Sequence, residues 1–336
     1  METPPTFRAW ITRSFLVVAG VLIIAEGSAR IFFGRSFEGR FDYGYHPNAG
    51  FDDSTRGSVR LFRAGGRRFH PQTYAADPAP GVSRILVAGD SVPRGPSLAA
   101  SYAKQLEDML NSAGAPAEVW NLAVPGYGAR RIQITALRAL RYKPSLLVLH
   151  LNDSNEFEDE REYRRSQDNK GWHPRTWLMK SLVFRRLHEA KTERIFWEWL
   201  PEKVREKSGL SDVDAEVAAS AKGETLDRWN ARVHEITRET IAKAMAQGTS
   251  VLLITQRSVV KDSSGQLSFV ESRLEEFAAS QTNRHVGMLS MRSVLQAENL
   301  SEMFADGSHL RAAGHTRIAQ AIRQKLIELE PRSAVR

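Results

Sequence analysis

The chain contains no cysteine among its 336 residues. Its absence excludes disulfide bonds, zinc–thiolate sites and cysteine nucleophiles. Two phosphate-binding patterns, G-x-x-x-x-G-K-[ST] and G-x-G-x-x-G, are also missing, which disfavours nucleotide chemistry. Internal repeats and low-complexity tracts are absent as well. What remains is a globular composition with 42% hydrophobic and 26% charged residues, ordinary for a protein that buries a core.

Positive charge is in excess but is not concentrated. The formal net charge is +8 and the isoelectric point is near 9.8. Lysine and arginine are spread along the chain and mixed with acids, as in Glu156–Arg165, whereas a nucleic-acid-binding surface gathers them on one element. We therefore predict no nucleic-acid partner and interpret the excess as a solvated basic surface near anionic lipid or cell-wall polymer.

One long hydrophobic run lies near the N-terminus. Phe15–Phe33 is apolar except for a few residues and would span about 28 Å as a helix, close to the thickness of a bilayer. Glu26 and Arg30 are spaced i,i+4 and can pair within that helix. Arg8 and Arg13 precede the run, which favours an N-inside orientation. We predict an uncleaved membrane anchor over residues 1–40, with the rest of the chain outside the cytoplasm; a cleaved signal peptide and a buried helix are the alternatives.

The remaining chain divides into a linker and one domain. Residues 41–80 are rich in Gly, Pro, Asp and Arg and are expected to form an irregular linker. Residues 81–332 alternate short apolar runs with amphipathic stretches, which predicts a three-layer α/β/α sandwich around a mostly parallel sheet. The expected strands are Ile85–Ala88, Val119–Ala123, Leu146–Leu151, Ser250–Thr255 and Val286–Met291, and the expected helices are Leu98–Ala113, Ala129–Arg141, Glu224–Ala246 and about Arg311–Leu329.

A helical insertion rich in tryptophan interrupts this alternation at about 156–248. It follows the third expected strand, so it lies at the edge of the sheet where ligands of such folds bind. A cap or partner-facing subdomain and an extra helical layer without a direct role are both open.

A serine and a histidine occupy positions suited to nucleophilic catalysis. Ser91 follows the first expected strand and precedes a helix, with Gly89 and Gly95 on either side. Because serine needs a base to take its proton, a histidine must lie within reach, oriented by a third group. His309 has Asp306 three residues before it, so one loop can present both. The G-x-S-x-G turn of another hydrolase class does not occur.

Two further residues can stabilise negative charge. Gly126 follows the second expected strand and offers an unobstructed N–H, and Asn152 follows the third and offers a side-chain amide. Preorganised donors of this kind stabilise the oxyanion of an acyl-transfer intermediate. Each has a plain structural alternative, a turn after Pro125 for the glycine and a helix cap for the asparagine. His315 is off the helical face of His309, so a two-histidine metal site is not expected.

Taken together, these segments resemble the SGNH hydrolases, the GDSL-type esterase and lipase superfamily. The likeness runs from about Arg84 to Leu329, outside the insertion. Two positions depart from the family pattern: His150 stands where the third block has glycine, and Pro93 removes one N–H at the helix start. The blocks that match are Gly89-Asp90-Ser91, Asn121-x4-Gly126, Asn152-Asp153 and Asp306-x-x-His309.

The resemblance implies a fold, a mechanism and a class of substrate. The fold would be a flavodoxin-like, five-stranded, mostly parallel sheet. Ser91 would be the nucleophile, His309 the base and Asp306 its orienter, with an oxyanion hole made of the Ser91 N–H, the Gly126 N–H and Asn152, and with no cofactor or metal. The expected substrate is an acylated small molecule, lipid or polysaccharide. An envelope polysaccharide O-acetyltransferase or deacetylase of the same fold, and a non-catalytic membrane-anchored binding protein, are the alternatives.

Overall fold

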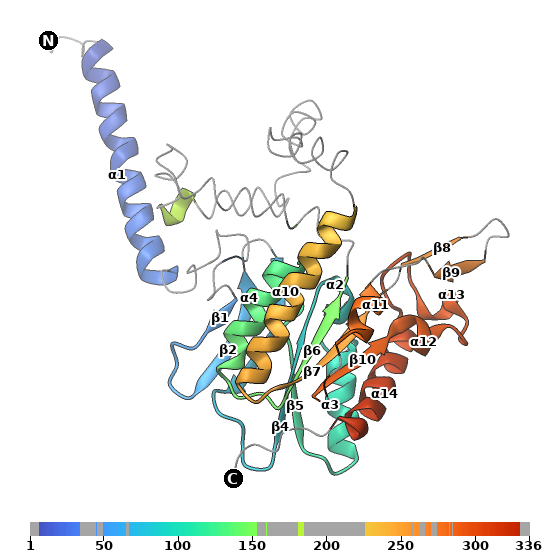
Figure 1. Cartoon of the computed structure of the whole chain (residues 1–336). Helices are drawn as coiled ribbons and strands as arrows, with labels where there is room; N and C mark the ends of the chain where they lie inside the picture. Colours follow the sequence, from blue (N-terminus) through green and yellow to red (C-terminus); the bar gives the residue numbers. More distant parts are fainter. Residues whose placement is uncertain are drawn as a thin grey trace, which may run out of the picture.

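A computed structural model describes residues 7–33, 45, 50–64, 67–152, 159, 181–184, 226–256, 258–261, 266–269, 274–281, 283 and 285–329. Its centre is a five-stranded parallel sheet in the order β10-β7-β6-β4-β5, with helices on both faces (Figure 1). This is the flavodoxin-like strand order, so the predicted three-layer α/β/α sandwich is confirmed. The strands are β4 (Ser83–Ala88), β5 (Ala117–Asn121), β6 (Leu146–Leu151), β7 (Ser250–Thr255) and β10 (Val286–Ser290).

The central strands are apolar along their whole length because helices cover both faces. Leu147 and Leu149 of β6 belong to the core beneath α4 and α10. Leu146 and Val148, which point the other way, belong to the core beneath α3 and α14. The bounds are α3 (Tyr102–Ser112), α4 (Ala129–Leu140), α10 (Leu226–Ala246) and α14 (Ala312–Glu328), within a few residues of those predicted.

The segment 41–80 differs from the expected irregular linker. Residues 51–75 form a three-stranded antiparallel sheet of β1 (Phe51–Asp52), β2 (Ser58–Ala64) and β3 (Arg67–Ala75). Val59, Leu61 and Phe69 are buried in the same core as α4. The prediction was wrong because charged residues separate these apolar ones, which is the alternation of strands with one buried face.

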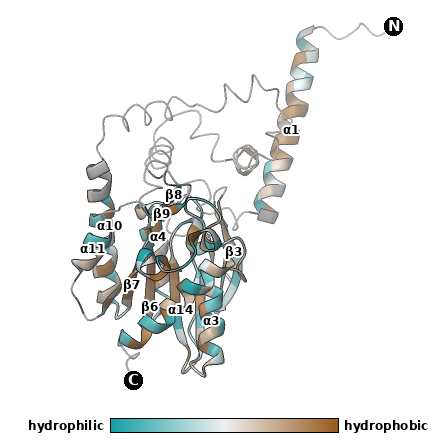
Figure 2. Cartoon of the chain, turned by 90° about the vertical axis from the view of Figure 1, so that its right-hand side faces the viewer, coloured by the Kyte–Doolittle hydropathy of each residue, from teal (hydrophilic) through white to brown (hydrophobic). Residues whose placement is uncertain are grey.

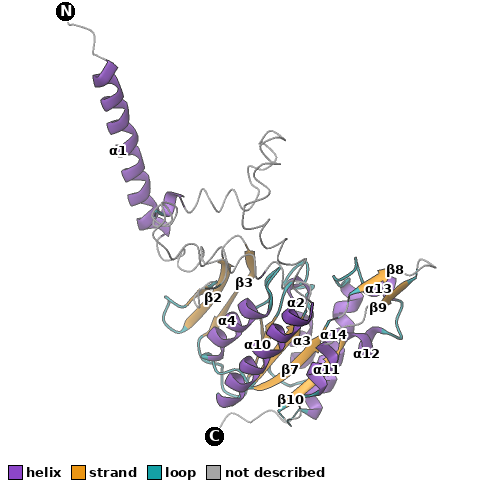
Figure 3. Cartoon of the chain, turned by 45° about the horizontal axis from the view of Figure 1, so that its top comes forward, coloured by secondary structure: helices purple, strands orange, loops and turns teal. Residues whose placement is uncertain are grey.

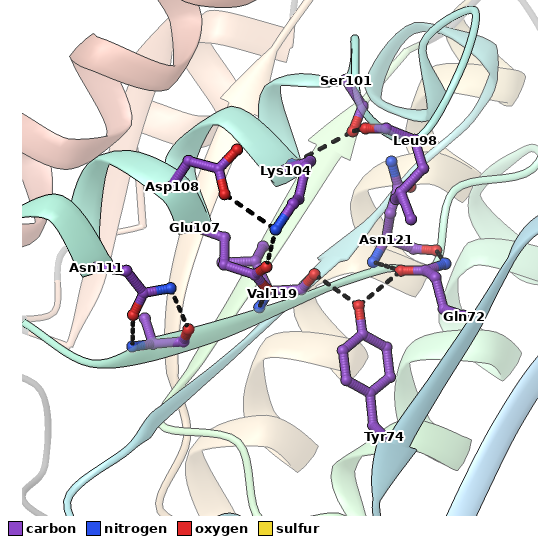
Figure 4. Close-up of polar contacts among 11 residues, drawn as sticks. Gln72, Tyr74, Leu98, Ser101, Lys104, Glu107, Asp108, Asn111, Val119 and Asn121 are labelled. Atoms are coloured by element: carbon purple, nitrogen blue, oxygen red, sulfur yellow. Dashed lines mark hydrogen bonds and ion pairs between the residues drawn. The ribbon is translucent and has the colours of Figure 1, made fainter.

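Strand β3 covers the open edge of the main sheet through its side chains (Figure 4). The Gln72 amide donates to the Asn121 carbonyl and its oxygen accepts the Asn121 N–H, both at 2.9 Å. The Tyr74 hydroxyl donates to the Val119 carbonyl at 3.0 Å. From α3, the Glu107 carboxylate accepts the Val119 N–H at 2.7 Å. The backbone groups of edge strand β5 are thereby satisfied, which prevents pairing with another chain.

Several short elements connect β7 to α14 and were not predicted. The short elements are β8 (Val259–Lys261), β9 (Leu267–Phe269), α11 (Leu274–Ala279), α12 (Met291–Leu295) and α13 (Leu300–Met303). Of these, α12 and α13 pack against α14, β8 and β9 pair beside α13 (Figure 3), and α11 packs against α10 on the other face of the sheet.

Much of the insertion, including most of Trp172–Leu200 and all of Ser208–Gly223, lies outside the described residues, as does Asp153.

Helix α1 (Phe7–Phe33) stands apart from the sheet and is predominantly hydrophobic (Figure 2). Its stretch Trp10–Ile31 is long and apolar enough to cross a membrane, a property that anchors and signal sequences share. Glu26 pairs with Arg30 at 2.8 Å, as the i,i+4 spacing predicted. Glu26 also accepts the Leu182 N–H at 3.0 Å, which ties the helix to the insertion.

Candidate active site

The segment carrying Ser91 is a tight turn from β4 into the short helix α2 (Ser91–Arg94). Asp90 caps this helix, since its Oδ1 accepts the Val92 N–H at 2.9 Å. The Asn121 amide donates to the Pro93 carbonyl at 3.1 Å and so holds the other end. Ser91 is the first helical residue, and its N–H therefore lies outside the helix's own hydrogen-bond pattern.

Gly89 is required by close packing rather than by substrate. A Cβ at this position would lie 2.4 Å from Cγ of Pro93 and 2.9 Å from Cβ of His150. Both distances are too short for carbon atoms in contact. The two residues that depart from the family pattern thus fill the space beside Gly89, and the turn needs a glycine there.

A loop from the far end of the chain brings the imidazole to this turn. His309 Nε2 lies 2.9 Å from Ser91 Oγ, and His309 Nδ1 lies 2.8 Å from Asp306 Oδ2. The other carboxylate oxygen of Asp306 accepts the N–H groups of Ser308 and His309, both at 2.8 Å. The carboxylate is thus fixed by its own loop, and the three side chains form one continuous hydrogen-bonded chain.

The charge state of Asp306 follows from these contacts. Burial alone would raise the pKa of Asp306, but the backbone N–H groups of His309 and Ser308 and the His309 imidazole outweigh it, and the pKa lies below the usual 3.8. The carboxylate is therefore ionised at neutral pH. The side chains of His309 and Asp306 are 49% and 58% exposed, so the site opens to solvent.

Asn152 reaches the same turn from β6. Its side-chain amide donates to Oδ2 of Asp90, and the residue is buried. The histidine at position 150 does not disturb the backbone that leads to Asn152, because β6 remains paired with β7 as far as Leu151. Asp90 therefore joins the Asn152 amide to the start of helix α2.

Gly126 lies in the loop after β5, at the same edge of the sheet. Its φ is +70°, a conformation that glycine adopts readily. Its carbonyl accepts from Nη2 of Arg131 at 2.6 Å, and the Arg131 guanidinium is in turn paired with the buried Asp159. A buried ion pair thus holds this glycine, while hydrogen bonds join Ser91 to His309, His309 to Asp306, and Asn152 to Asp90.

Solved ester hydrolases share this topology, although no protein-family model and no curated protein matches the sequence. A GDSL-like lipase from Bacteroides thetaiotaomicron is 10% identical, with a TM-score of 0.38 over 73% of this chain and 88% of its own. A variant of Axe2, an acetyl-xylooligosaccharide esterase from Geobacillus, is 13% identical, with a TM-score of 0.41 over 76% and 96%. The SGNH-hydrolase family esterase AlinE4 is 15% identical, with a TM-score of 0.37 over 76% and 100%. The likeness is one of topology alone.

The described residues contain no group of three His, Asp or Glu side chains arranged to hold a metal ion. His315 is buried in α14 beside Tyr102. Burial, with a smaller contribution from His150, lowers the pKa of His315 to about 4. His315 is therefore a neutral core residue at pH 7.

The roles of two buried polar residues near the site were not predicted from the sequence. Asp90 holds Asn152 and caps α2 at once. Gln256, directly after β7, bonds to His150 and to the backbone of the loop carrying His309. Their positions after parallel strands were the available signal, because the carboxyl ends of such strands meet at one edge.

Proposed function

We propose that the chain is a serine hydrolase of the SGNH type that cleaves acyl esters through an acyl-enzyme. The hydrogen-bonded chain from Asp306 through His309 to Ser91 carries the proposal. It joins residues 218 positions apart in the sequence, and its order of carboxylate, imidazole and hydroxyl is the one that activates a serine.

In this mechanism His309 Nε2 accepts the Ser91 proton while Oγ attacks the ester carbonyl. Asp306 holds the proton on Nδ1, which leaves Nε2 free to act as the base, and it stabilises the imidazolium that forms. The intermediate collapses when His309 protonates the departing alcohol. A water molecule, activated by the same imidazole, then attacks the acyl-enzyme and releases the acid.

The oxyanion of each tetrahedral intermediate requires hydrogen-bond donors that point at it. We assign this role to the N–H groups of Ser91 and Gly126 and to the side-chain amide of Asn152. One such donor typically contributes about 3–4 kcal/mol to transition-state stabilisation. The Asp90 carboxylate fixes the orientation of the Asn152 amide, which makes the donor preorganised.

Asn152→Ala is expected to lower kcat for a short-chain aryl ester by about 10²-fold or more, because one oxyanion donor is lost. KM should change little, since the contact strengthens only in the transition state. Steady-state kinetics of the detergent-solubilised full chain measure both, with circular dichroism to verify folding. An unchanged kcat would remove Asn152 from the oxyanion hole.

The openness of the site favours an acyl group carried on a large molecule. His309 and Asp306 are about half exposed, so an ester on a lipid or a polysaccharide can approach. An envelope O-acetyltransferase differs from a hydrolase only in whether a sugar hydroxyl or water takes the acyl group. The exposed site and the apolar helix α1 are compatible with hydrolysis and with acetyl transfer, so the two activities differ in the acyl acceptor alone.

Acceptor competition separates the two activities. The full chain in detergent is supplied with an activated acetyl ester and a polysaccharide, and free acetate and acetylated sugar are quantified together. The hydrolase predicts that acetate accounts for nearly all product at every sugar concentration. Acetyl transfer to sugar that outruns hydrolysis would select the transferase.

The apolar helix α1 bears on where the hydrolase domain lies. We propose that α1 is an uncleaved membrane anchor with its N-terminus inside, as Arg8 and Arg13 favour, and that the hydrolase domain, residues 81–332, lies outside the cytoplasm. If the chain were instead a non-catalytic binding protein of the same fold, the wild type would show no ester turnover.

A further inference from the structure

A continuous chain of buried polar side chains runs beneath the candidate active site. The Tyr102 hydroxyl bonds to His150 Nδ1 at 3.0 Å, and His150 Nε2 bonds to Gln256 Oε1 at 2.9 Å. Gln256 Nε2 then donates to the Ser308 carbonyl at 3.2 Å. Tyr102, His150 and Gln256 are almost completely buried. A buried network of this kind stabilises one arrangement strongly when every member is satisfied.

The direction of every bond in this chain is determined. Because Gln256 Nε2 donates to Ser308, its Oε1 faces His150 and can only accept. His150 therefore carries its proton on Nε2, and Nδ1 accepts from the Tyr102 hydroxyl. Burial lowers the pKa of His150, although the nearby Asp90 opposes this effect. The imidazole is thus a neutral link with one donor and one acceptor, each paired.

This polar chain contacts both halves of the proposed catalytic machinery. Within the chain, Cβ of His150 packs beside Gly89, in the turn that presents Ser91. At one end, the Ser308 carbonyl belongs to the loop between Asp306 and His309. That loop is exposed, and the described residues also hold it through the Val259 N–H on the Gly307 carbonyl at 2.8 Å and the contact of the Ser258 and Ser308 hydroxyls at 3.5 Å.

We propose that His150 and Gln256 are positioning residues that set the loop of Asp306 and His309 at the correct distance from the Ser91 turn, with Tyr102 fixing the imidazole tautomer. This inference rests on the proposed hydrolase function. It explains why a bulky histidine occupies the place of glycine in β6: its Cβ packs beside Gly89 in the nucleophile turn while its imidazole bonds to Gln256. A displacement of reacting groups by about 1 Å can cost 10²-fold in rate, so such a bridge has a measurable effect.

Gln256→Met tests the bridge, because methionine is similar in size and removes both hydrogen bonds. We expect kcat to fall by about 10- to 100-fold with KM nearly unchanged, and the rate of reaction with a fluorophosphonate to fall in parallel. Tyr102→Phe keeps both bonds of Gln256 and should lower kcat only a few-fold. Equal losses in the two variants, or wild-type kcat in Gln256→Met, would overturn the proposal.

Thr255→Val is the matched control. Thr255 is the neighbour of Gln256, is equally buried, and its hydroxyl has no hydrogen-bond partner among the described residues. Its replacement should leave kcat within about two-fold of wild type, since substitutions away from such contacts are mild. A loss as large as that of Gln256→Met would mean that the site responds to any change in this strand, and would contradict a specific bridge.

Two measurements distinguish a failure of this inference from a failure of the proposed function. They are the activity of the wild type, and crystal structures of the wild type and Gln256→Met. If the wild type neither turns over esters nor reacts with the fluorophosphonate, the hydrolase function fails. The bridge is judged separately by the distance from His309 Nε2 to Ser91 Oγ. It is supported when that distance lengthens in Gln256→Met, and an unchanged distance overturns it.

Discussion

Replacing Ser91 with alanine is expected to lower kcat for an aryl ester by about 10⁶-fold, the loss typical of a catalytic serine. The alanine removes the nucleophile but keeps the backbone N–H of α2, so substrate binding should persist. Stopped assays with purified full-length protein measure the residual rate. Among the described residues the Ser91 hydroxyl bonds to His309, and the loss of this partly exposed contact should change the thermal midpoint of unfolding little.

Ser97→Ala is the appropriate comparison for this variant. Ser97 is an exposed serine six residues further along the chain, and its hydroxyl accepts the Ala100 N–H at 3.2 Å. It should retain wild-type kcat. Substantial turnover by Ser91→Ala, with Ser97→Ala unaffected, would eliminate the serine mechanism.

Asp306→Asn is expected to lower kcat by about 10⁴-fold. The asparagine oxygen can still accept the N–H groups of Ser308 and His309, so the loop should keep its shape. Its amide, however, donates towards His309 Nδ1 and forces the imidazole proton onto Nε2, where the base is needed. The structure of the variant should therefore be unchanged while its activity is lost.

The pH dependence provides a second test of Asp306. Because the pKa of Asp306 is lowered, its carboxylate stays ionised at pH values where an ordinary aspartate is partly protonated, and it takes up a proton only in stronger acid. The wild-type kcat profile should therefore show no aspartate titration above about pH 4. Asp108→Asn, which changes an exposed carboxylate paired with Lys104, should leave both kcat and its profile intact. Equal activity of Asp306→Asn and the wild type would contradict the role of Asp306.

The sheet could be predicted because its strands are continuous apolar runs. The bounds of β6 and β7 agree with the sequence prediction to the residue. The residues proposed for catalysis were found because each stands where a parallel strand ends or a helix begins, and such positions meet at one edge. Short motifs at these points therefore carried most of the information about the site.

Other parts of the structure could not be read from local pattern. Strands β2 and β3 escaped prediction because charged residues accompany their few apolar ones, Arg60 and Arg63 in β2 and Arg67 and Arg68 in β3. Their apolar residues are buried only by packing in the same core as α4. His150 was interpreted only as a departure from a family pattern, since its partners Tyr102 and Gln256 are 48 and 106 residues away. Contacts at that sequence separation are made by the tertiary fold.

Mapping of a covalent adduct shows directly whether Ser91 is the nucleophile. Full-length protein is incubated with a fluorophosphonate, digested with trypsin and analysed by mass spectrometry. We expect one adduct, on Ser91 within the peptide Ile85–Arg94, that is absent from Ser91→Ala and slow to form in Asp306→Asn. An esterase-active preparation in which Ser91 stays unmodified, or in which the adduct lies on another residue, would contradict it.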